Sequence, residues 1–218
     1  YLIAYFFMYK QTKIKGWVYA ILVGESFIIY YFCGSRNALA VSMLLIIGKM
    51  ISSMKWINRE YIKRKINAVL GFLAGYSVVF YCLVTAITSM FLENGFFSLL
   101  DFAFSYRFTY VAMKVQSLGV SLFPKMTNEE YFADKIIIDN GYAFVAIRYG
   151  LIMIVVLSLI VHVMAKRYRD DMFVLLSIVL ITALNFVDND IFDYSCFPFL
   201  VIGIKCLVSG FRGKLSYA

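Results

Sequence analysis

The stretch INAVLGFLAGYSVVFYCLVTAITSMF, residues 66–91, contains no Asp, Glu, Lys or Arg. An α-helix needs about 20 predominantly apolar residues to cross about 30 Å of hydrocarbon, so this stretch is long enough to span a membrane. Similar apolar runs recur along the chain between polar loops, whereas a β-barrel would show short alternating segments. The runs predict helices near 16–33, 37–54, 66–91, 141–165, 172–187 and 196–210.

The overall composition favours the same class of protein. Of the 218 residues, 62% are apolar and 16% are charged, whereas a soluble domain is about 45–50% apolar and about 25% charged. We therefore expect an all-α, polytopic integral membrane helical bundle that forms a single transmembrane domain over residues 1–218. The chain starts with the short apolar stretch YLIAYFFMY and has no initiating Met. We interpret this start as the tail of a cut helix, and the chain as the C-terminal part of a longer protein.

The distribution of charged residues predicts the orientation of the helices. Lys and Arg gather in the C-terminal tail and in the short segments 10–15, 55–65 and 166–171. Because short basic loops stay on the cytoplasmic side, these segments are predicted to be cytoplasmic. The outer side then holds most of the acidic residues, in the segments 34–36, 92–140 and 188–195. The net charge of +8 is interpreted as a topology signal, and no nucleic-acid partner is expected.

The outer segment 92–140 is too long for a simple turn, and long structured loops are usually functional. Residues 96–123 mix apolar side chains with Asp101, Arg107 and Lys114 at spacings typical of amphipathic helix. We therefore expect this outer loop to contain amphipathic helices that lie along the membrane surface. The more polar residues 125–135 then predict a solvated connection back to the membrane.

The cysteines show no metal-binding spacing, and they lie in or beside apolar helices, where a thiol is a small core residue. Cys33 and Cys196 both fall near the predicted outer face, which leaves a disulfide between them open. HExxH, GxSxG and the Gly-rich phosphate loop do not occur in the sequence. We expect neither a metal ion nor a cofactor.

Ionisable residues inside membrane spans indicate function by default because they are costly to keep there. Lys49 and Lys205 weaken that default, since each falls near the inner end of its helix and reaches the interface from there. His162, the only histidine, also falls near a cytoplasmic helix end and is interpreted as structural. Glu25 lies deeper, and either a structural ion pair or a catalytic acid accounts for it.

Three arginines, Arg36, Arg107 and Arg148, fall on the predicted outer side. Arg36 stands at an outward hairpin against the positive-inside rule, so it either meets lipid headgroups or provides a fixed cation for an anionic ligand. A guanidinium group holds phosphate oxygens bidentately and keeps its proton. A membrane-embedded pyrophosphate is therefore the ligand that we predict for the three arginines.

Asp139 and Asn140 directly precede the apolar run of the helix expected near 141–165. Either residue caps free N–H groups and suits the helix dipole. A carboxylate at this position can also accept a proton from a sugar hydroxyl, which makes Asp139 a general-base candidate. The residues alone leave both interpretations open.

Three segments resemble the superfamily of O-antigen ligases and Wzy-type polysaccharide polymerases. DNGYAFVAIRYG resembles the helix-entry motif, in which a polar residue and Asn precede an aromatic residue and a Gly, here Asp139, Asn140, Tyr142 and Gly150. GSRNA resembles the Ser-Arg element at the outer end of an earlier helix, here Ser35 and Arg36. SYRFTYVAMKVQSLGVSLFP resembles the arginine-bearing outer loop, here Arg107 with Gly119 after it.

The resemblance covers nearly the whole chain and matches the C-terminal half of such proteins. It implies a GT-C-like bundle that acts as a metal-independent glycosyltransferase on the outer face of the bacterial cytoplasmic membrane. Oligosaccharide repeat units carried on undecaprenyl pyrophosphate would be joined into a surface polysaccharide, an O-antigen or a capsule. Membrane lipids, a chain-length regulator and a flippase are the further partners. The implied catalytic residues are Asp139 and Arg107, and the substrate-binding residues are Ser35, Arg36, Asn140, Tyr142 and Arg148.

One departure from the family pattern bears on the reaction. In the ligases a His usually precedes the Asn, whereas this sequence has Asp139. The departure favours a polymerase over a ligase that transfers finished glycan to another acceptor. A flippase or transporter of lipid-linked sugar and a non-catalytic membrane subunit remain alternatives of other classes, although no internal repeat of the transporter kind occurs in the sequence.

Overall fold

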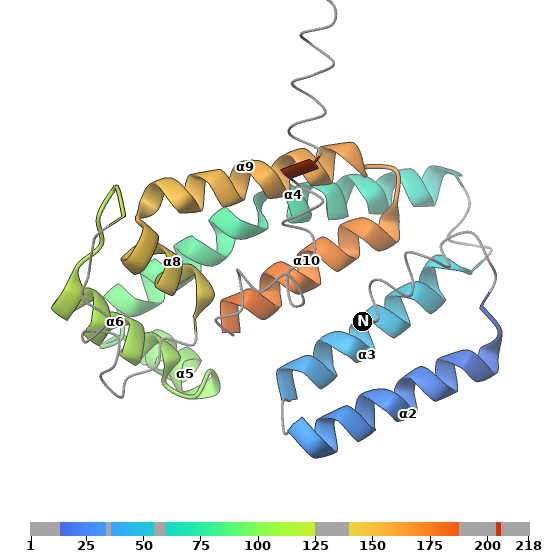
Figure 1. Ribbon diagram of the computed structural model, residues 1–218, viewed down its shortest axis with the longest axis horizontal. Helices are drawn as coiled ribbons and strands as arrows, with labels where there is room; N and C mark the ends of the chain where they lie inside the picture. The colour runs from blue at the N-terminus through green and yellow to red at the C-terminus, as the bar shows by residue number, and fades with distance from the viewer. Residues whose placement is uncertain (1–13, 34–35, 55–59, 125–139, 188–203, 206–218) are drawn as a thin grey trace, which may run out of the picture. The chain divides into compact units, whose positions relative to one another are not determined.

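The computed structural model describes residues 14–33, 36–54, 60–124, 140–187 and 204–205. Within these ranges every extended regular element is an α-helix (Figure 1), which confirms the all-α prediction. The helices are α2 (Gly16–Cys33), α3 (Arg36–Ser52), α4 (Glu60–Met90), α5 (Gly95–Ala103), α6 (Arg107–Leu118), α8 (Gly141–Tyr149), α9 (Leu151–Arg167) and α10 (Met172–Val187).

Helix bounds follow the apolar runs closely where a run is continuous. The helices α2 and α10 have the bounds predicted from the sequence. Helix α4 begins earlier than predicted, at Glu60, so part of the basic segment 55–65 is helical. Long Lys, Arg and Glu side chains are good helix formers, and Arg64 pairs with Glu60 one turn away at 3.4 Å. The helix predicted near 196–210 lies outside the described residues except for 204–205.

The prediction of one helix near 141–165 is wrong, because Gly150 divides this run into α8 and α9. Gly150 has φ 81° and ψ 167°, a conformation that ends α8. The Leu151 N–H donates to the Ser121 carbonyl oxygen at 2.9 Å, and the Ile152 N–H donates to the Leu122 carbonyl at 3.1 Å. The backbone of residues 121–122 thus accepts two of the N–H groups that begin α9 and have no acceptor within that helix.

Two compact units divide the chain. Unit 1 takes Tyr1–Ala74 and Ala165–Leu184, and its described part contains the α2–α3 hairpin with most of α10. Its core cluster consists of Leu22, Leu45, Ile46 and Phe173. Helices α3 and α10 approach closely at Gly48, where an added Cβ would collide with the Leu176 side chain.

Unit 2 takes Gly75–Met164 and Asn185–Ala218. Its described part contains the second half of α4, the short helices α5, α6 and α8, most of α9 and the end of α10. Helices α5 and α6 lie within the segment where amphipathic helices were expected. The faces of α6 and α8 meet in a buried cluster of Val111, Ala143 and Ile147, against which Val115, Leu118 and Phe144 pack.

Among the described residues, α4 is the one helix that is both long and apolar enough to cross a membrane. Only 28% of its most apolar 18-residue window is buried, so it does not have the surroundings of a core helix in a soluble protein. Its exposed large apolar residues recur at helical spacing from end to end and form the α4 strip, namely Val69, Phe72, Leu73, Tyr76, Val79, Phe80, Leu83, Ile87 and Met90.

Candidate functional site

Asn140 fixes the start of α8. Its side chain is 1% exposed, and its Oδ1 accepts the Ala143 N–H at 2.9 Å, the geometry of a helix N-cap. Its Nδ2 donates to Thr85 Oγ1 at 3.0 Å, and Thr85 Oγ1 donates to the Tyr81 carbonyl at 2.9 Å. The capping interpretation of Asn140 is therefore correct, and the same side chain also ties α8 to α4.

Aromatic rings connect the start of α8 to the start of α6. The ring of Tyr142, 1% exposed, stacks on Tyr81 with centroids 6.2 Å apart and planes 10° apart. Tyr81 meets Phe186 at 5.1 Å, and Phe186 meets Phe108 at 5.7 Å. These contacts pack the Tyr142 ring against its neighbours. The role of Tyr142 in binding substrate stays a prediction.

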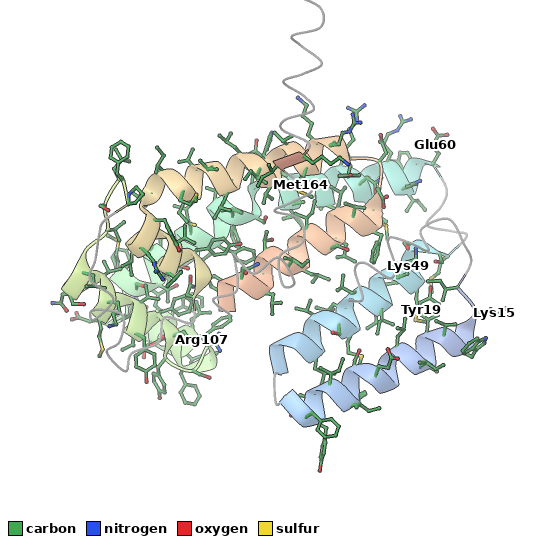
Figure 2. The ribbon with its side chains drawn as sticks, viewed as in Figure 1. Lys15, Tyr19, Lys49, Glu60, Arg107 and Met164 are labelled. Carbon is green, nitrogen blue, oxygen red and sulfur yellow. The ribbon has the colours of Figure 1, made fainter. Side chains whose placement is uncertain are left out.

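Arg107 is the first residue of α6 and is half-buried (Figure 2). The turn before it is tight, because Ser105 and Tyr106 both have positive φ and the Tyr106 N–H donates to the Asp101 carbonyl at 2.8 Å. A cation at a helix N-terminus opposes the helix dipole.

Asp101 lies on α5 and is buried. Its side chain is 3% exposed, and its Oδ1 accepts the Phe108 N–H at 2.8 Å and the Thr109 N–H at 3.2 Å. Its Oδ2 accepts Thr109 Oγ1 at 2.5 Å. Asp101 on α5 thus caps α6 from the preceding helix, where a carboxylate suits the helix dipole.

Arg148 lies in the last turn of α8, where a cation suits the dipole. Its guanidinium carbon lies 5.6 Å from the ring centroid of Phe144 and 5.6 Å from that of Tyr149, distances typical of cation–π contacts. Eight residues separate it from Asn140, which corresponds to about 12 Å along the helix. Arg148 and Asn140 therefore mark opposite ends of α8.

The two ends of α8 have different neighbours. The loop that follows α6 bonds to Leu151 and Ile152, directly after α8 ends. The C-terminal ends of α6 and α8 are therefore close, and since the helices pack side by side, Arg107 lies toward the start of α8. Unit 2 thus brings Arg107, Asn140 and Tyr142 toward one end of this helix pair and holds Arg148 at the other.

The remaining predicted site residues belong to unit 1 or lie outside the described residues. Ser35 and Asp139 lie outside the described residues. Arg36 begins α3, in unit 1. Within the part of the chain that the structure describes, no three His, Cys, Asp or Glu side chains form a group that could hold a metal ion.

Neither a protein-family model, nor a curated protein, nor a solved structure matches this chain. The resemblance to polysaccharide polymerases and ligases therefore stays a prediction.

Proposed function

We propose that this chain is part of a membrane glycosyltransferase that joins oligosaccharide repeat units carried on undecaprenyl pyrophosphate. The reaction takes place on the outer face of the bacterial cytoplasmic membrane and uses no metal. Arg107 and Arg148, with Arg36 and Ser35, hold phosphate and sugar groups of the substrates. Asp139 activates the acceptor hydroxyl. This assignment rests on the motif resemblance together with the placement of Arg107 and Asn140 in unit 2.

Several features support a multi-pass membrane protein. The α4 strip exposes large apolar side chains along the whole helix, an arrangement that is stable against lipid and unfavourable against water. Shorter apolar helices cover Gly16–Phe32, Leu39–Ser52 and Met172–Phe186. Helices α5 and α6 expose large side chains at helical spacing, many of them aromatic, which suits the interface between membrane and water. These side chains are Phe96, Leu99, Phe102, Tyr106, Tyr110 and Met113.

The placement of Arg107 is the observation that carries the proposed chemistry. The cation stands at the start of α6, where Asp101 fixes the backbone from one side and the ring of Phe108 packs against Phe186. Asn140 fixes the start of α8 with equal precision. A cation at such a helix start can stabilise negative charge as it develops on a leaving group. Asp139 directly precedes Asn140 in the sequence.

The proposed step is a single displacement at the anomeric carbon of the donor. The acceptor hydroxyl oxygen forms the new glycosidic bond, and the bond from that carbon to the pyrophosphate oxygen breaks. The carboxylate of Asp139 takes the hydroxyl proton as the bond forms. Undecaprenyl pyrophosphate leaves with the bonding electron pair, and Arg107 stabilises the charge on its phosphate oxygens.

A ligase is the nearest alternative, because it would use the same donor end and differ in its acceptor. The presence of aspartate rather than histidine before Asn140 favours the polymerase. The two reactions differ in product, since a polymerase yields a ladder of chain lengths and a ligase moves one finished chain.

The test is substitution in the full-length protein in cells, scored by the ladder of polysaccharide lengths. We expect Arg107→Gln and Asp139→Asn to abolish the ladder while single lipid-linked repeats accumulate. The matched control is Arg64→Gln, because the Arg64 side chain is 81% exposed and pairs only with a neighbour on its own helix turn. An unchanged ladder in the Arg107 and Asp139 variants, at equal protein level, would contradict the proposal.

A further inference from the structure

The α5–α6 turn, residues 104–106, holds two successive residues in the left-handed region of the backbone. Ser105 has φ 57°, and Tyr106 has φ 63° and ψ 23°. This region is unfavourable for residues that carry a Cβ atom, whereas glycine adopts it without that cost. The α5–α6 turn is therefore a strained segment of the backbone.

The residues of the α5–α6 turn are not those that would relieve the strain. Helix α5 ends with the two bonds of a Schellman motif, because the Ser105 N–H donates to the Phe102 carbonyl at 3.0 Å and the Tyr106 N–H donates to the Asp101 carbonyl at 2.8 Å. Glycine is the usual residue at the position of Ser105 in this motif. Tyr106 is the N-cap residue of α6 and its side chain makes no capping bond, whereas Ser, Thr, Asp and Asn are preferred there. Residues that favour a stable connection between helices are thus absent at both positions.

Asp101 holds the α5–α6 turn from both sides. Its carbonyl oxygen accepts the Tyr106 N–H, and its Oδ1 accepts the Phe108 N–H at 2.8 Å and the Thr109 N–H at 3.2 Å. Thr109 Oγ1 donates to its Oδ2 at 2.5 Å. Asp101 is 3% exposed, so water competes little for these bonds. Arg107 is the residue between two N–H groups that Asp101 fixes, those of Tyr106 and Phe108.

We propose that Asp101 is a positioning residue of the proposed reaction, which holds the strained α5–α6 turn closed and thereby sets the position of the Arg107 backbone. This inference rests on the proposed function, since that function assigns the leaving group to Arg107. Strained backbone persists only where neighbouring structure holds it, and it gathers at functional sites. A small displacement of a group that acts on the transition state costs much of the rate. Asp101 acts through the Arg107 backbone and needs no contact with substrate.

The experiment measures the rate of polymer formation by the purified full-length protein in nanodiscs. Lipid-linked repeat units are supplied over a range of concentrations, at a temperature where every variant compared is folded. Asp101→Ala removes the carboxylate, so the turn relaxes and Arg107 moves. We expect the maximum rate to fall about tenfold or more, while KM stays close to that of the wild type. Asp101→Asn keeps an acceptor oxygen for the two backbone N–H groups and should restore most of the rate.

Asn94→Ala is the matched control, because it removes a cap at the other end of α5. Asn94 Oδ1 accepts the Phe96 N–H at 3.0 Å in an exposed position. This variant should lower Tm and leave the rate unchanged. If it slows the reaction as much as Asp101→Ala does, the effect of Asp101 is one of stability alone and the inference is overturned.

Two further variants test the inference even if Asp101→Ala does not fold. Ser105→Gly should raise Tm, because glycine adopts φ 57° without steric cost and the Ser105 side chain is exposed. A lower Tm would show that the turn is not strained. Thr109→Val keeps the shape of the side chain and removes one donor to Asp101, which should lower the maximum rate about threefold. An unchanged rate in Thr109→Val, or in folded Asp101→Ala, would overturn the inference.

Failure of this inference and failure of the proposed function give different results. If the wild-type protein makes no polymer, the proposed function is wrong and Asp101 has no reaction to serve. If the wild type makes polymer and Arg107→Gln does not, while folded Asp101→Ala reacts as fast as the wild type, only the role of Asp101 is wrong.

Discussion

Units 1 and 2 each bury a lysine, and they treat it differently. In unit 1, Lys49 is 6% exposed and its ammonium lies 5.3 Å from the centroid of the Phe173 ring. In unit 2, Lys114 is 7% exposed, and it belongs with Phe108 and Val111 to the buried face of α6. The stems of both lysines are therefore covered by apolar side chains, and in unit 1 an aromatic ring also lies near the ammonium.

The two units also differ in the lengths of their helices and in how the helix ends are capped. The described part of unit 1 contains α2, α3, the first half of α4 and most of α10. Unit 2 contains, besides the second half of α4 and most of α9, the short helices α5, α6 and α8, of 9, 12 and 9 residues. The ends of these short helices are closed by Asn94, Asp101, Asn140 and the 121–122 backbone. Short helices gain little stability from their own hydrogen bonds. Unit 2 therefore depends on specific caps.

The largest effect is expected at Gly150. Gly150→Ala puts a side chain at φ 81° and brings its Cβ to 2.6 Å from the Leu122 carbonyl oxygen. Strain and overpacking together should lower the free energy of unfolding by about 4 kcal/mol. The control is Gly24→Ala in α2 of unit 1, where an added Cβ meets nothing within 4 Å; alanine should stabilise that helix slightly. Equal stability of the two variants in thermal unfolding would contradict the contrast between the units.

Asp101→Ala should have the next largest effect. The change removes the acceptor of two backbone N–H groups of α6 and of the Thr109 hydroxyl, in a buried position. We expect the free energy of unfolding to fall by about 3 kcal/mol. Asp170→Ala removes an aspartate whose side chain is 93% exposed and should cost less than about 0.5 kcal/mol. Denaturant titration of both variants decides whether the cap of α6 is needed.

Asn140→Ala tests a cap that also makes a tertiary hydrogen bond. We expect a loss of about 2 kcal/mol, because one cap bond and the bond to Thr85 both disappear. Asn94→Ala removes a cap of the same kind whose bond to the Phe96 N–H is exposed, and it should cost about 1 kcal/mol. A double-mutant cycle with Thr85→Val would measure the tertiary part. No coupling between positions 85 and 140 would show that the bond contributes nothing.

The smallest effect is expected at Lys49, and its sign matters most. Lys49→Met removes the contact between the ammonium and the Phe173 ring, which should lower stability by about 1 kcal/mol. Lys114→Met removes no such ring contact and should change stability by less than about 0.5 kcal/mol. Equal shifts of the unfolding temperature in the two variants would contradict this distinction.

Part of this architecture is readable from the sequence because membrane-length apolar runs have a simple pattern. The bounds of α2 and α10 follow from that pattern, and the cap at Asn140 follows from the preference of Asn for helix starts. The break at Gly150 is not readable in this way. A single glycine in an apolar run is common, and what divides the helix is the backbone at 121–122, about 30 residues earlier in the chain.

The candidate site shows the same limit. The motifs predict Arg107, Asn140 and Tyr142 as site residues. The cap that Asp101 provides and the burial of Lys114, in contrast, depend on tertiary contacts. Both residues fit an amphipathic pattern. Helical spacing alone does not show which charged face of a helix is covered by other helices. A structure is needed to distinguish a solvated lysine from a buried one.

The most direct test of the central claim is a reaction with purified components. The full-length protein in nanodiscs would be incubated with lipid-linked repeat units extracted from the cells that make them, in the presence of EDTA, and the products would be separated by length. We predict a ladder of polymers with the wild-type and Arg64→Gln proteins and only unpolymerised repeats with Arg107→Gln. A ladder that is equally long with folded Arg107→Gln protein, or no ladder with the wild type, would contradict the account.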